Sequence, residues 1–492
     1  MVTLILKNRK FVIFFILAIA FFLRLYHLGY HDFWYDEIAT LSYARYPSNN
    51  WDPPLHWIML HFWKKAFGVS EFSLRFPSLI FSLLSVILTF FLGKELFNKK
   101  IGIVASIFIG FSPFHLWYAQ EARSYSMVLF LGTLSSFLFC KVIKEGKLRL
   151  WALFILVSIL GLYTNYLYIF LFLAQGLYLI FSKRFGLGFK ETIYFLIIIL
   201  GFSFYLPRFL TAFYCTWQGF WIPKPTVKSL IVTTENFILG YNGFFLIYLI
   251  SDVLVGLFFI SALWAITKKE FRAPFIFCIF LFSIPILLTF FFSRVFFSVY
   301  LDRGLIIFSP YLYLVLSLGI VSSKKWINRL FLITLILIFF MAIHRYYTDR
   351  ITSNLLHRTG AFVKKPFKHV VSFIENKLEE EDIVAVTNNN PPIIPSLAFY
   401  SKSHQNYYFF FDPKIKDPNY QRPIIETKFD VPFYKINSLE FKNLWLIASD
   451  GGNRNGGLDA NSLIVKDWLD KKYKLDLTSE FYGLWVFRYI RH

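Results

Sequence analysis

Long apolar segments constrain the fold of this chain more than any other feature. A helix that crosses a bilayer needs about 20 apolar residues, because its backbone polar groups must all be bonded within the segment. Of the 492 residues, 57% are hydrophobic and only 16% are charged, which is outside the range of soluble globular proteins. We therefore expect a polytopic α-helical membrane protein with about eleven transmembrane helices, at residues 11–28, 77–97, 101–117, 124–142, 149–164, 166–182, 192–213, 244–266, 273–292, 302–321 and 327–344.

The first apolar segment also has features of a signal peptide. Basic residues precede it, and Ala18-Ile19-Ala20 offers the small residues of a cleavage site. The apolar run nevertheless continues to Leu28, which is about the length needed to cross a bilayer. We therefore expect an uncleaved first transmembrane helix.

Basic residues are concentrated in alternate connections between the apolar segments. By the positive-inside rule, such short basic connections face the cytoplasm. The connections 29–76, 113–124, 214–243 and 293–303 are longer or richer in aromatic and acidic residues, so we expect them outside. The basic clusters are Lys7/Arg9/Lys10, Lys94/Lys99/Lys100, Lys141/Lys144/Lys147/Arg149, Lys183/Arg184/Lys190, Lys268/Lys269/Arg272 and Lys324/Lys325/Arg329.

This pattern predicts a multi-pass protein of the cytoplasmic membrane. The N-terminus is cytoplasmic, and an odd number of spans places everything after Arg345 outside the cell. Membrane orientation also accounts for the formal charge of +21. Nucleic acid is not an expected partner, because no basic face interleaved with stacking aromatics occurs outside the membrane segments.

The composition changes after about residue 362, where charged residues return and apolar runs shorten. Residues 382–387, 407–411 and 444–448 have the pattern of strands, and residues 367–378 and 460–473 that of amphipathic helices. We therefore predict two domains, a transmembrane catalytic domain at residues 1–350 and an extracytoplasmic α/β domain at residues 362–492.

Three carboxylates lie in the first outer loop, between residues 31 and 54. Asp36 and Glu37 are adjacent and follow Phe33, Trp34 and Tyr35. They could simply be solvated loop acids. Partly apolar surroundings near a membrane span would instead raise the pKa of a carboxyl group and suit a general base.

Asp52, the third carboxylate, precedes a short amphipathic segment. Leu55, Ile58, Met59, Phe62, Trp63, Ala66 and Phe67 recur at helical spacing, so we expect a helix along the membrane surface, with Asp52 as its N-cap. Asp52 and His56, four residues apart, could alternatively hold a divalent metal with Glu37. The sequence favours capping and predicts no certain cofactor.

Two arginines lie at the predicted outer ends of spans. Arg123 follows a segment that also contains His115 and Glu121, and Arg303 begins the tenth span. A Glu121–Arg123 ion pair or an interfacial snorkelling arginine is the structural interpretation. The functional interpretation is that both guanidinium groups bind the phosphate of a lipid headgroup.

Several of these motifs together resemble a known family. The stretches Asp36-Glu37, Asp52-Pro53-Pro54-Leu55, Glu71-Phe72-Ser73-Leu74-Arg75-Phe76-Pro77-Ser78, Ser112-Pro113-Phe114-His115 and Tyr118-Ala119-Gln120-Glu121-Ala122-Arg123-Ser124-Tyr125 resemble the prokaryotic branch of the dolichyl-phosphate-mannose protein mannosyltransferases. These membrane glycosyltransferases have the GT-C fold and are related to the aminoarabinose transferase of lipid A. The resemblance covers residues 1–130 and extends more weakly through Asp302-Arg303.

The resemblance implies a specific reaction. A sugar would move, with inversion at its anomeric carbon, from a polyprenyl-phosphate carrier to a protein, lipid or glycan acceptor at the outer membrane face. It implies that Asp36 is the catalytic acid residue with Glu37 as partner, and that Arg123 and Arg303 bind the carrier phosphate. We expect His115, Tyr118, Gln120, Glu121 and Asp52 to bind substrate.

A transporter or flippase of lipid-linked sugars is the alternative. A transporter places ionisable groups near the bilayer midplane, on broken and repeated helices. The charges singled out here instead lie at the outer edge of the predicted spans, and the sequence shows no clear repeat. The pattern therefore favours an enzyme.

Overall fold

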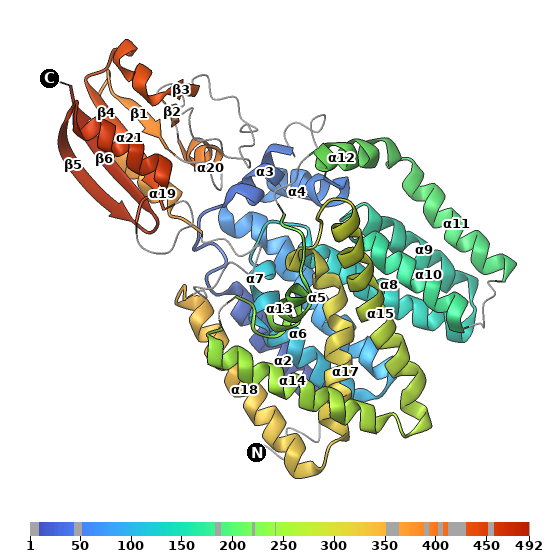
Figure 1. Ribbon diagram of the computed structural model, residues 1–492. Coiled ribbons are helices and arrows are strands. Elements are labelled where there is room, and N and C mark those ends of the chain that lie inside the picture. Colours follow the sequence, from blue (N-terminus) through green and yellow to red (C-terminus); the bar gives the residue numbers. More distant parts are fainter. Residues whose placement is uncertain are drawn as a thin grey trace. The chain divides into compact units, whose positions relative to one another are not determined.

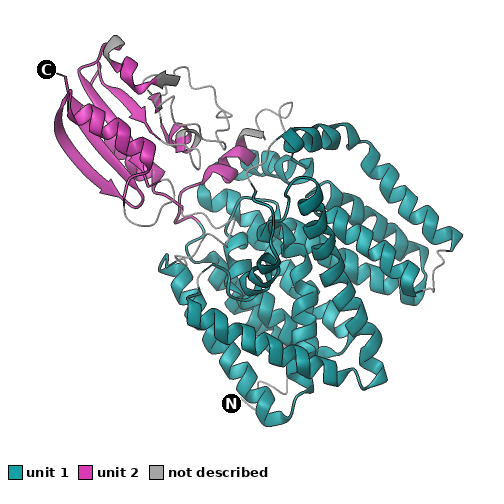
Figure 2. Ribbon diagram, viewed as in Figure 1, with its two compact units in different colours: residues 1–28, 46–361 teal, residues 29–45, 362–492 magenta. Residues whose placement is uncertain are grey.

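The chain forms two compact units, each built from discontinuous parts of the sequence (Figure 2). The computed structural model describes residues 9–43, 52–182, 188–218, 222–241, 243–350, 364–387, 393–401, 407–411, 430–450 and 457–491. Unit 1 consists of Met1–Leu28 and Tyr46–Ala361, and unit 2 of Gly29–Arg45 and Phe362–His492. Residues 29–45, with Asp36 and Glu37, therefore group with the C-terminal unit, whereas the predicted division assigned them to residues 1–350.

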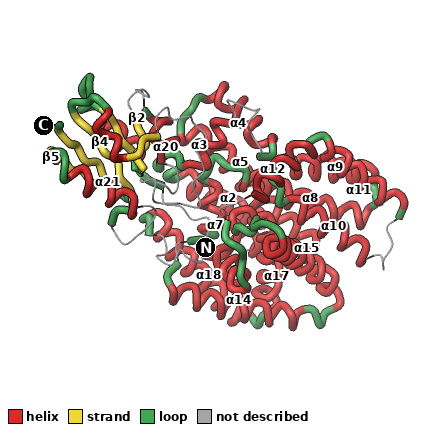
Figure 3. The backbone as a smooth tube through the Cα atoms, turned by 45° about the horizontal axis from the view of Figure 1, so that its top comes forward, coloured by secondary structure: helices red, strands yellow, loops and turns green. Residues whose placement is uncertain are grey.

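In its described residues, unit 1 consists of helices joined by loops and turns (Figures 1 and 3). Its helices are α2 (Arg9–Leu25), α4 (Pro54–Phe67), α5 (Glu71–Leu96), α6 (Lys99–Phe111), α7 (Pro113–Ala119), α8 (Tyr125–Glu145), α9 (Leu148–Leu162), α10 (Tyr168–Ser182), α11 (Phe189–Ser203), α12 (Leu206–Gln218), α13 (Val227–Leu239), α14 (Phe245–Ala265), α15 (Lys269–Val295), α16 (Asp302–Leu305), the 3₁₀ helix η2 (Ile306–Phe308), α17 (Ser309–Ser322) and α18 (Lys325–Tyr347).

The membrane-spanning character of unit 1 follows from these helices. Within the described residues, six helices are long and apolar enough to cross a membrane, and the bent pairs α6–α7 and α11–α12 raise the number to eight. Shorter apolar helices lie at 11–25, 148–162 and 168–182. A helix thus occurs in each predicted span, but the number eleven stays a prediction. The assignment of each connection to one side of the membrane also stays a prediction. Of the basic residues on which it depends, Lys7, Lys183 and Arg184 lie outside the described residues.

The core of unit 1 surrounds the stretch from α16 to α17. Within Asp302–Ser322, 94% of an apolar 18-residue stretch is buried inside the protein, against 28% of the corresponding stretches of α14 and α18. At Gly319 of α17, an added Cβ would lie 1.8 Å from the carbonyl oxygen of Phe258 in α14. Small residues allow such close approach of helix backbones in membranes.

A break between α6 and α7 turns the chain by 59° just before the motif that contains Arg123. Ser112 caps α7 and Pro113 occupies its first turn, as is favoured at a helix start. Arg24 of α2 is fully buried and donates hydrogen bonds to the carbonyl oxygens of Ile109 and Gly110, at 2.9 and 2.8 Å. A guanidinium thus satisfies carbonyl groups that the end of α6 leaves without helical partners.

Unit 2 contains a six-stranded sheet in the order β3-β2-β1-β4-β6-β5. Strands β1 to β4 pair in parallel, whereas β6 pairs antiparallel with β4 and β5. The predicted strands at 382–387, 407–411 and 444–448 and both predicted helices are present. The elements are α3 (Tyr35–Tyr43), α19 (Phe367–Glu375), β1 (Ile383–Val386), α20 (Ile393–Tyr400), β2 (Tyr407–Phe411), β3 (Asp430–Pro432), η5 (Phe433–Ser438), β4 (Asn443–Ser449), α21 (Ala460–Asp470), β5 (Lys474–Phe481) and β6 (Leu484–Ile490).

Helices cover both faces of this sheet. One apolar core joins α19 and α20 to alternate residues of β1 and β4, such as Val384 and Trp445. A second core joins α21 to the intervening residues, such as Ala385 and Leu446. Strands β1 and β4 are buried at every position, which is typical of parallel strands covered on both sides.

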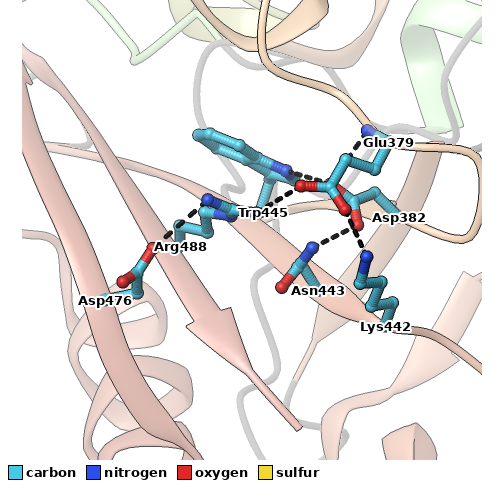
Figure 4. Close-up of polar contacts among 7 residues, drawn as sticks. All are labelled: Glu379, Asp382, Lys442, Asn443, Trp445, Asp476 and Arg488. Carbon is cyan, nitrogen blue, oxygen red and sulfur yellow. Dashed lines mark hydrogen bonds and ion pairs between the residues drawn. The ribbon is translucent and has the colours of Figure 1, made fainter.

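A polar cluster ties the loop before β1 to the sheet (Figure 4). The buried Asp382 carboxylate accepts hydrogen bonds from Asn443 Nδ2 at 2.7 Å and Trp445 Nε1 at 2.9 Å. Arg488 of β6 forms an ion pair with Glu379 at 3.0 Å. Because a buried carboxylate is costly unless hydrogen-bonded, this cluster fixes the register of the loop against β4 and β6.

Candidate active site

Both predicted phosphate-binding arginines of unit 1 face the same aromatic ring. Arg123 lies in the turn between α7 and α8, Tyr125 is the first residue of α8, and Arg303 lies in α16. The Cζ atom of each arginine is 5.8 Å from the centroid of the Tyr125 ring. Tyr125 and Arg303 are each only 5% exposed. Two permanent positive charges are therefore concentrated around one buried ring, within the distance at which a cation interacts with an aromatic face.

Asp52 contributes a negative charge beside this arrangement. Its Oδ2 atom lies 3.6 Å from Arg123 Nη1, with the Asp52 side chain 48% exposed. The predicted role of Asp52 as N-cap of the following helix is wrong, because α4 begins at Pro54 with Pro53 as N-cap and without a side-chain cap. The Leu55 N–H instead donates to the Tyr163 carbonyl at 2.9 Å. A tertiary contact thus replaces the cap and leaves the Asp52 carboxylate directed toward Arg123.

His56, on α4, is 4% exposed. Burial, and then the nearby charge of Arg123, lowers the pKa of His56 to about 3, so its imidazole is neutral. Its Nε2 atom is buried and has no hydrogen-bond partner among the described residues. A neutral imidazole can ligate a metal, but the described residues contain no group of three or more His, Cys, Asp or Glu side chains suited to holding one. A divalent ion at Asp52 and His56 therefore stays a prediction.

The amphipathic helix α4 matches the predicted segment, but the apolar residues of its stripe differ in burial. Leu55 and Met59 are partly buried against the core of unit 1. Ile58, Phe62 and Phe67 are exposed, at 39, 64 and 62%. Such exposed apolar side chains on a short helix suit a position along the membrane surface. The location of α4 at the membrane surface stays a prediction.

Arg303 is positioned through its neighbour, Asp302. The buried Asp302 carboxylate accepts hydrogen bonds from Thr233 Oγ1 and Asn236 Nδ2, both at 2.5 Å. Both partners lie on α13, so this helix fixes the first turn of α16 and with it Arg303. Thr233 and Asn236 carry no motif of their own, and sequence reasoning did not single them out.

The four motif residues predicted to bind substrate are buried in unit 1 and bonded within the protein. His115 Nε2 lies 3.0 Å from Tyr313 Oη, and Tyr118 Oη lies 2.6 Å from Tyr241 Oη. Glu121 accepts a hydrogen bond from Trp117 Nε1 at 2.6 Å.

Gln120 is likewise buried and hydrogen-bonded within the protein, and it links three parts of unit 1. Its amide nitrogen donates to the carbonyl oxygens of Arg24 and Tyr26, at 2.9 and 2.6 Å. Its amide oxygen accepts a hydrogen bond from Tyr346 of α18 at 2.5 Å. The observed contacts of Gln120 therefore hold the turn before Arg123 against the end of α2 and α18.

The predicted catalytic acids, Asp36 and Glu37, begin α3 of unit 2, whereas the two arginines belong to unit 1. Glu37 is 0% exposed, and its Oε2 atom accepts a hydrogen bond at 3.3 Å from the backbone N–H of Trp34, just before the helix. This is the backward bond by which an acid in the first turn satisfies a helix N-terminus. Asp36 is partly exposed. The structure therefore distinguishes a fully buried capping acid, Glu37, from Asp36, which is partly exposed although its Oδ2 atom is buried.

Known proteins resemble the chain in part of its sequence and in its fold. Residues 52–210 match the family described as dolichyl-phosphate-mannose-protein mannosyltransferase. The crystal structure of ArnT from Cupriavidus metallidurans bound to undecaprenyl phosphate is similar, with a TM-score of 0.61, 12% sequence identity, and coverage of 96% of this chain and 97% of that one. Its apo form has a TM-score of 0.59 at the same identity and coverage. No curated protein sequence matches.

Proposed function

We propose, on the premise of its PMT/ArnT-type GT-C fold, that this multi-pass membrane protein is a glycosyltransferase whose donor is a polyprenyl-phosphate-linked sugar. The family match over residues 52–210 supports a sugar transferase. The undecaprenyl phosphate bound to ArnT supports a lipid-linked donor. A hexosyl or pentosyl group would pass to a protein, lipid or glycan acceptor.

The observation that carries this proposal is the pair of arginines at the Tyr125 ring. Each guanidinium is permanently charged and presents planar donors that match phosphate oxygens. Arg123 and Arg303 come from elements 180 positions apart in sequence (303 − 123), yet both lie 5.8 Å from one ring centroid. Two cations held in this way suit the charge of a carrier phosphate.

The chemistry that we propose is an inverting displacement. The acceptor oxygen forms a bond to the anomeric carbon while the bond from that carbon to the carrier phosphate oxygen breaks. The polyprenyl phosphate leaves with the bonding electron pair, and Arg123 and Arg303 stabilise its developing negative charge. The acceptor proton passes to a carboxylate that acts as general base, and Asp36 is our candidate. We route no step through a metal.

We further propose that transfer takes place at the outer face of the cytoplasmic membrane. The basic clusters of the predicted cytoplasmic connections support this orientation. The lipid tail of the donor stays in the bilayer, so a phosphate-binding pair near the outer ends of spanning helices suits such a substrate.

A transporter or flippase of lipid-linked sugars is the second candidate. The two bent helix pairs, at 59° and 70°, favour it, since transporters build binding sites from broken helices. A transporter moves the intact donor across the bilayer, whereas a transferase releases the free carrier phosphate. The products therefore separate the two candidates.

The test uses purified protein and a panel of radiolabelled undecaprenyl-phosphate sugars, with free carrier phosphate and labelled acceptor as readouts. We expect one donor to be consumed, and Arg123→Ala and Arg303→Ala each to lower kcat/KM by about 10- to 100-fold, since a hydrogen bond to a charged group contributes about 1.5–3 kcal/mol. Arg345→Ala is the control, because Arg345 lies at another ring, Phe244, at 5.6 Å.

Two results would contradict the proposal. Flipping of the donor without release of carrier phosphate would identify a transporter. Turnover in both arginine variants equal to that of Arg345→Ala would remove the phosphate-binding role of the pair.

A further inference from the structure

A helix of unit 2 takes its N-terminal cap from the segment that carries Asp36. Helix α19 begins after Pro366, which has no side-chain oxygen and makes no cap. The backbone N–H of Lys368, in the first turn, donates instead to Asp32 Oδ2 at 2.7 Å, across 336 positions of sequence. Asp32 is 7% exposed. A buried carboxylate at a helix N-terminus satisfies a free N–H and interacts favourably with the helix dipole.

A second contact fixes the next residue of the same segment. The backbone N–H of Phe33 donates to Tyr400 Oη at 2.7 Å, and the Phe33 ring packs edge-on against Phe399 with centroids 5.5 Å apart. Phe399 and Tyr400 end α20, and Ser401 then donates to Glu375 at the end of α19, at 2.9 Å. Helices α19 and α20 thus form one support, which binds residues 32 and 33 at two points.

The supported segment leads directly into α3. This helix has only nine residues, and an isolated helix of that length is marginal in water. Its observed supports are the Glu37 bond to Trp34 and packing of α3 against α20. The placement of α3, and of Asp36 on it, therefore depends on contacts with α19 and α20 as well as on the local sequence.

We propose that the C-terminal unit positions the catalytic base, with Asp32 and Tyr400 as positioning residues that hold the segment from which Asp36 projects. This inference rests on the proposed function, in which Asp36 accepts the acceptor proton. It gives residues 362–492 an indirect part in the transfer step, through the segment that carries Asp36. A general base must lie within hydrogen-bond reach of the proton that it removes, so a small displacement of α3 lowers kcat.

The experiment compares capping variants in the full-length protein. Asp32→Ala removes the oxygen that caps α19, whereas Asp32→Asn keeps an acceptor oxygen there. Tyr400→Phe removes only the hydroxyl group. The matched controls are Asp459→Ala, which removes the N-cap of α21, and Tyr482→Phe, whose side chain is 56% exposed.

We expect Asp32→Ala and Tyr400→Phe to lower kcat by at least about tenfold with the donor KM unchanged, because geometry at the base is lost while donor binding is kept. Asp32→Asn should restore most of kcat. Hydrogen exchange should accelerate in residues 35–43 in Asp32→Ala and Tyr400→Phe, but in neither control.

The outcomes distinguish this inference from the proposed function. Asp36→Asn, assayed alongside, should be folded and nearly inactive. If it is inactive while Asp32→Ala and Tyr400→Phe match their controls in kcat and in exchange, the positioning role is wrong and the proposed base stands. If Asp36→Asn turns over normally, the proposed base is wrong and the positioning role falls with it.

Discussion

At the scale of single residues, the candidate site combines two arginines that the sequence singles out with a tyrosine ring to which the sequence assigns no role. Arg123 and Arg303 stand out because arginine is costly at a membrane boundary unless it is paired or used. Tyr125 is an ordinary first residue of an apolar helix, and only its contacts with both guanidinium groups distinguish it. Aromatic residues are abundant in this chain, at 21%, so composition could not identify the one that matters.

The Tyr125 ring can be tested directly. Tyr125→Leu should raise the donor KM by roughly 5- to 30-fold, because two cation–π contacts of about 0.5–1 kcal/mol or more are lost. Tyr125→Phe keeps the ring and should bind the donor like the wild type. Steady-state kinetics with the donor identified above would measure both. A Phe variant as impaired as the Leu variant would assign the effect to the hydroxyl group instead.

Asp52 shows how tertiary contacts can give a residue a different role from the one that its local sequence favours. Its position before Pro53-Pro54 favours an N-cap. In the folded chain the Tyr163 carbonyl accepts from the Leu55 N–H, and Tyr205 Oη donates to the Asp52 carbonyl at 2.8 Å. The backbone is thereby anchored, and the carboxylate pairs with Arg123.

At the scale of elements, the break between α6 and α7 brings the Arg123 motif to its place. Pro113 is a sequence signal for this break, since proline ends helices but is accepted in a first turn. Hydrophobicity alone nevertheless predicts one continuous span over residues 101–117, because both helices are apolar. Arg24, which satisfies the end of α6, is distant in sequence and lies within the first predicted span, where a buried cation is unusual.

Removing the Arg24 guanidinium should therefore destabilise unit 1. Arg24→Met keeps much of the apolar stem but leaves the buried Ile109 and Gly110 carbonyls without this donor. We expect a loss of stability on the order of 3 kcal/mol, since an unsatisfied buried polar group costs about 1–3 kcal/mol. The shift in the thermal unfolding midpoint in detergent would measure it, with Arg345→Met as control. Equal shifts in the two variants would contradict the capping role.

At the scale of the whole molecule, the predicted orientation in the membrane underlies the assignment of the reaction to the outer face. The basic clusters at residues 268–272 and 324–329 are expected inside, and the C-terminal unit outside. The orientation is therefore tested by the location of the ends of α15 and α18 relative to the membrane.

A reporter fusion measures the sides directly. Alkaline phosphatase fused after Ala361 should be active, because the enzyme folds only outside the cytoplasm, and the same enzyme fused after Lys268 should be inactive. A green fluorescent protein at each position should give the opposite pattern. Phosphatase activity after Lys268 together with none after Ala361 would reverse the proposed orientation.

The sequence by itself determined the membrane class, the apolar segments in which helices occur and the central strands of the C-terminal sheet. These features depend on local hydrophobicity and periodicity, which neighbouring residues carry. The pair β5–β6 was missed, because β5 is largely exposed and lacks the apolar signal on which strand prediction depends. Helix α20 was missed as well, since eight residues give only a short periodic pattern.

Only the tertiary structure decided which unit holds the predicted acids and what surrounds the arginines. Residues 29–45 join the C-terminal unit through bonds such as Asp32 to Lys368, which spans 336 positions. Arg123 and Arg303 meet at Tyr125 because α13 fixes α16 through Asp302. Such contacts link residues whose local patterns are unrelated, so no periodicity in the sequence predicts them, and packing of the folded chain alone brings them together.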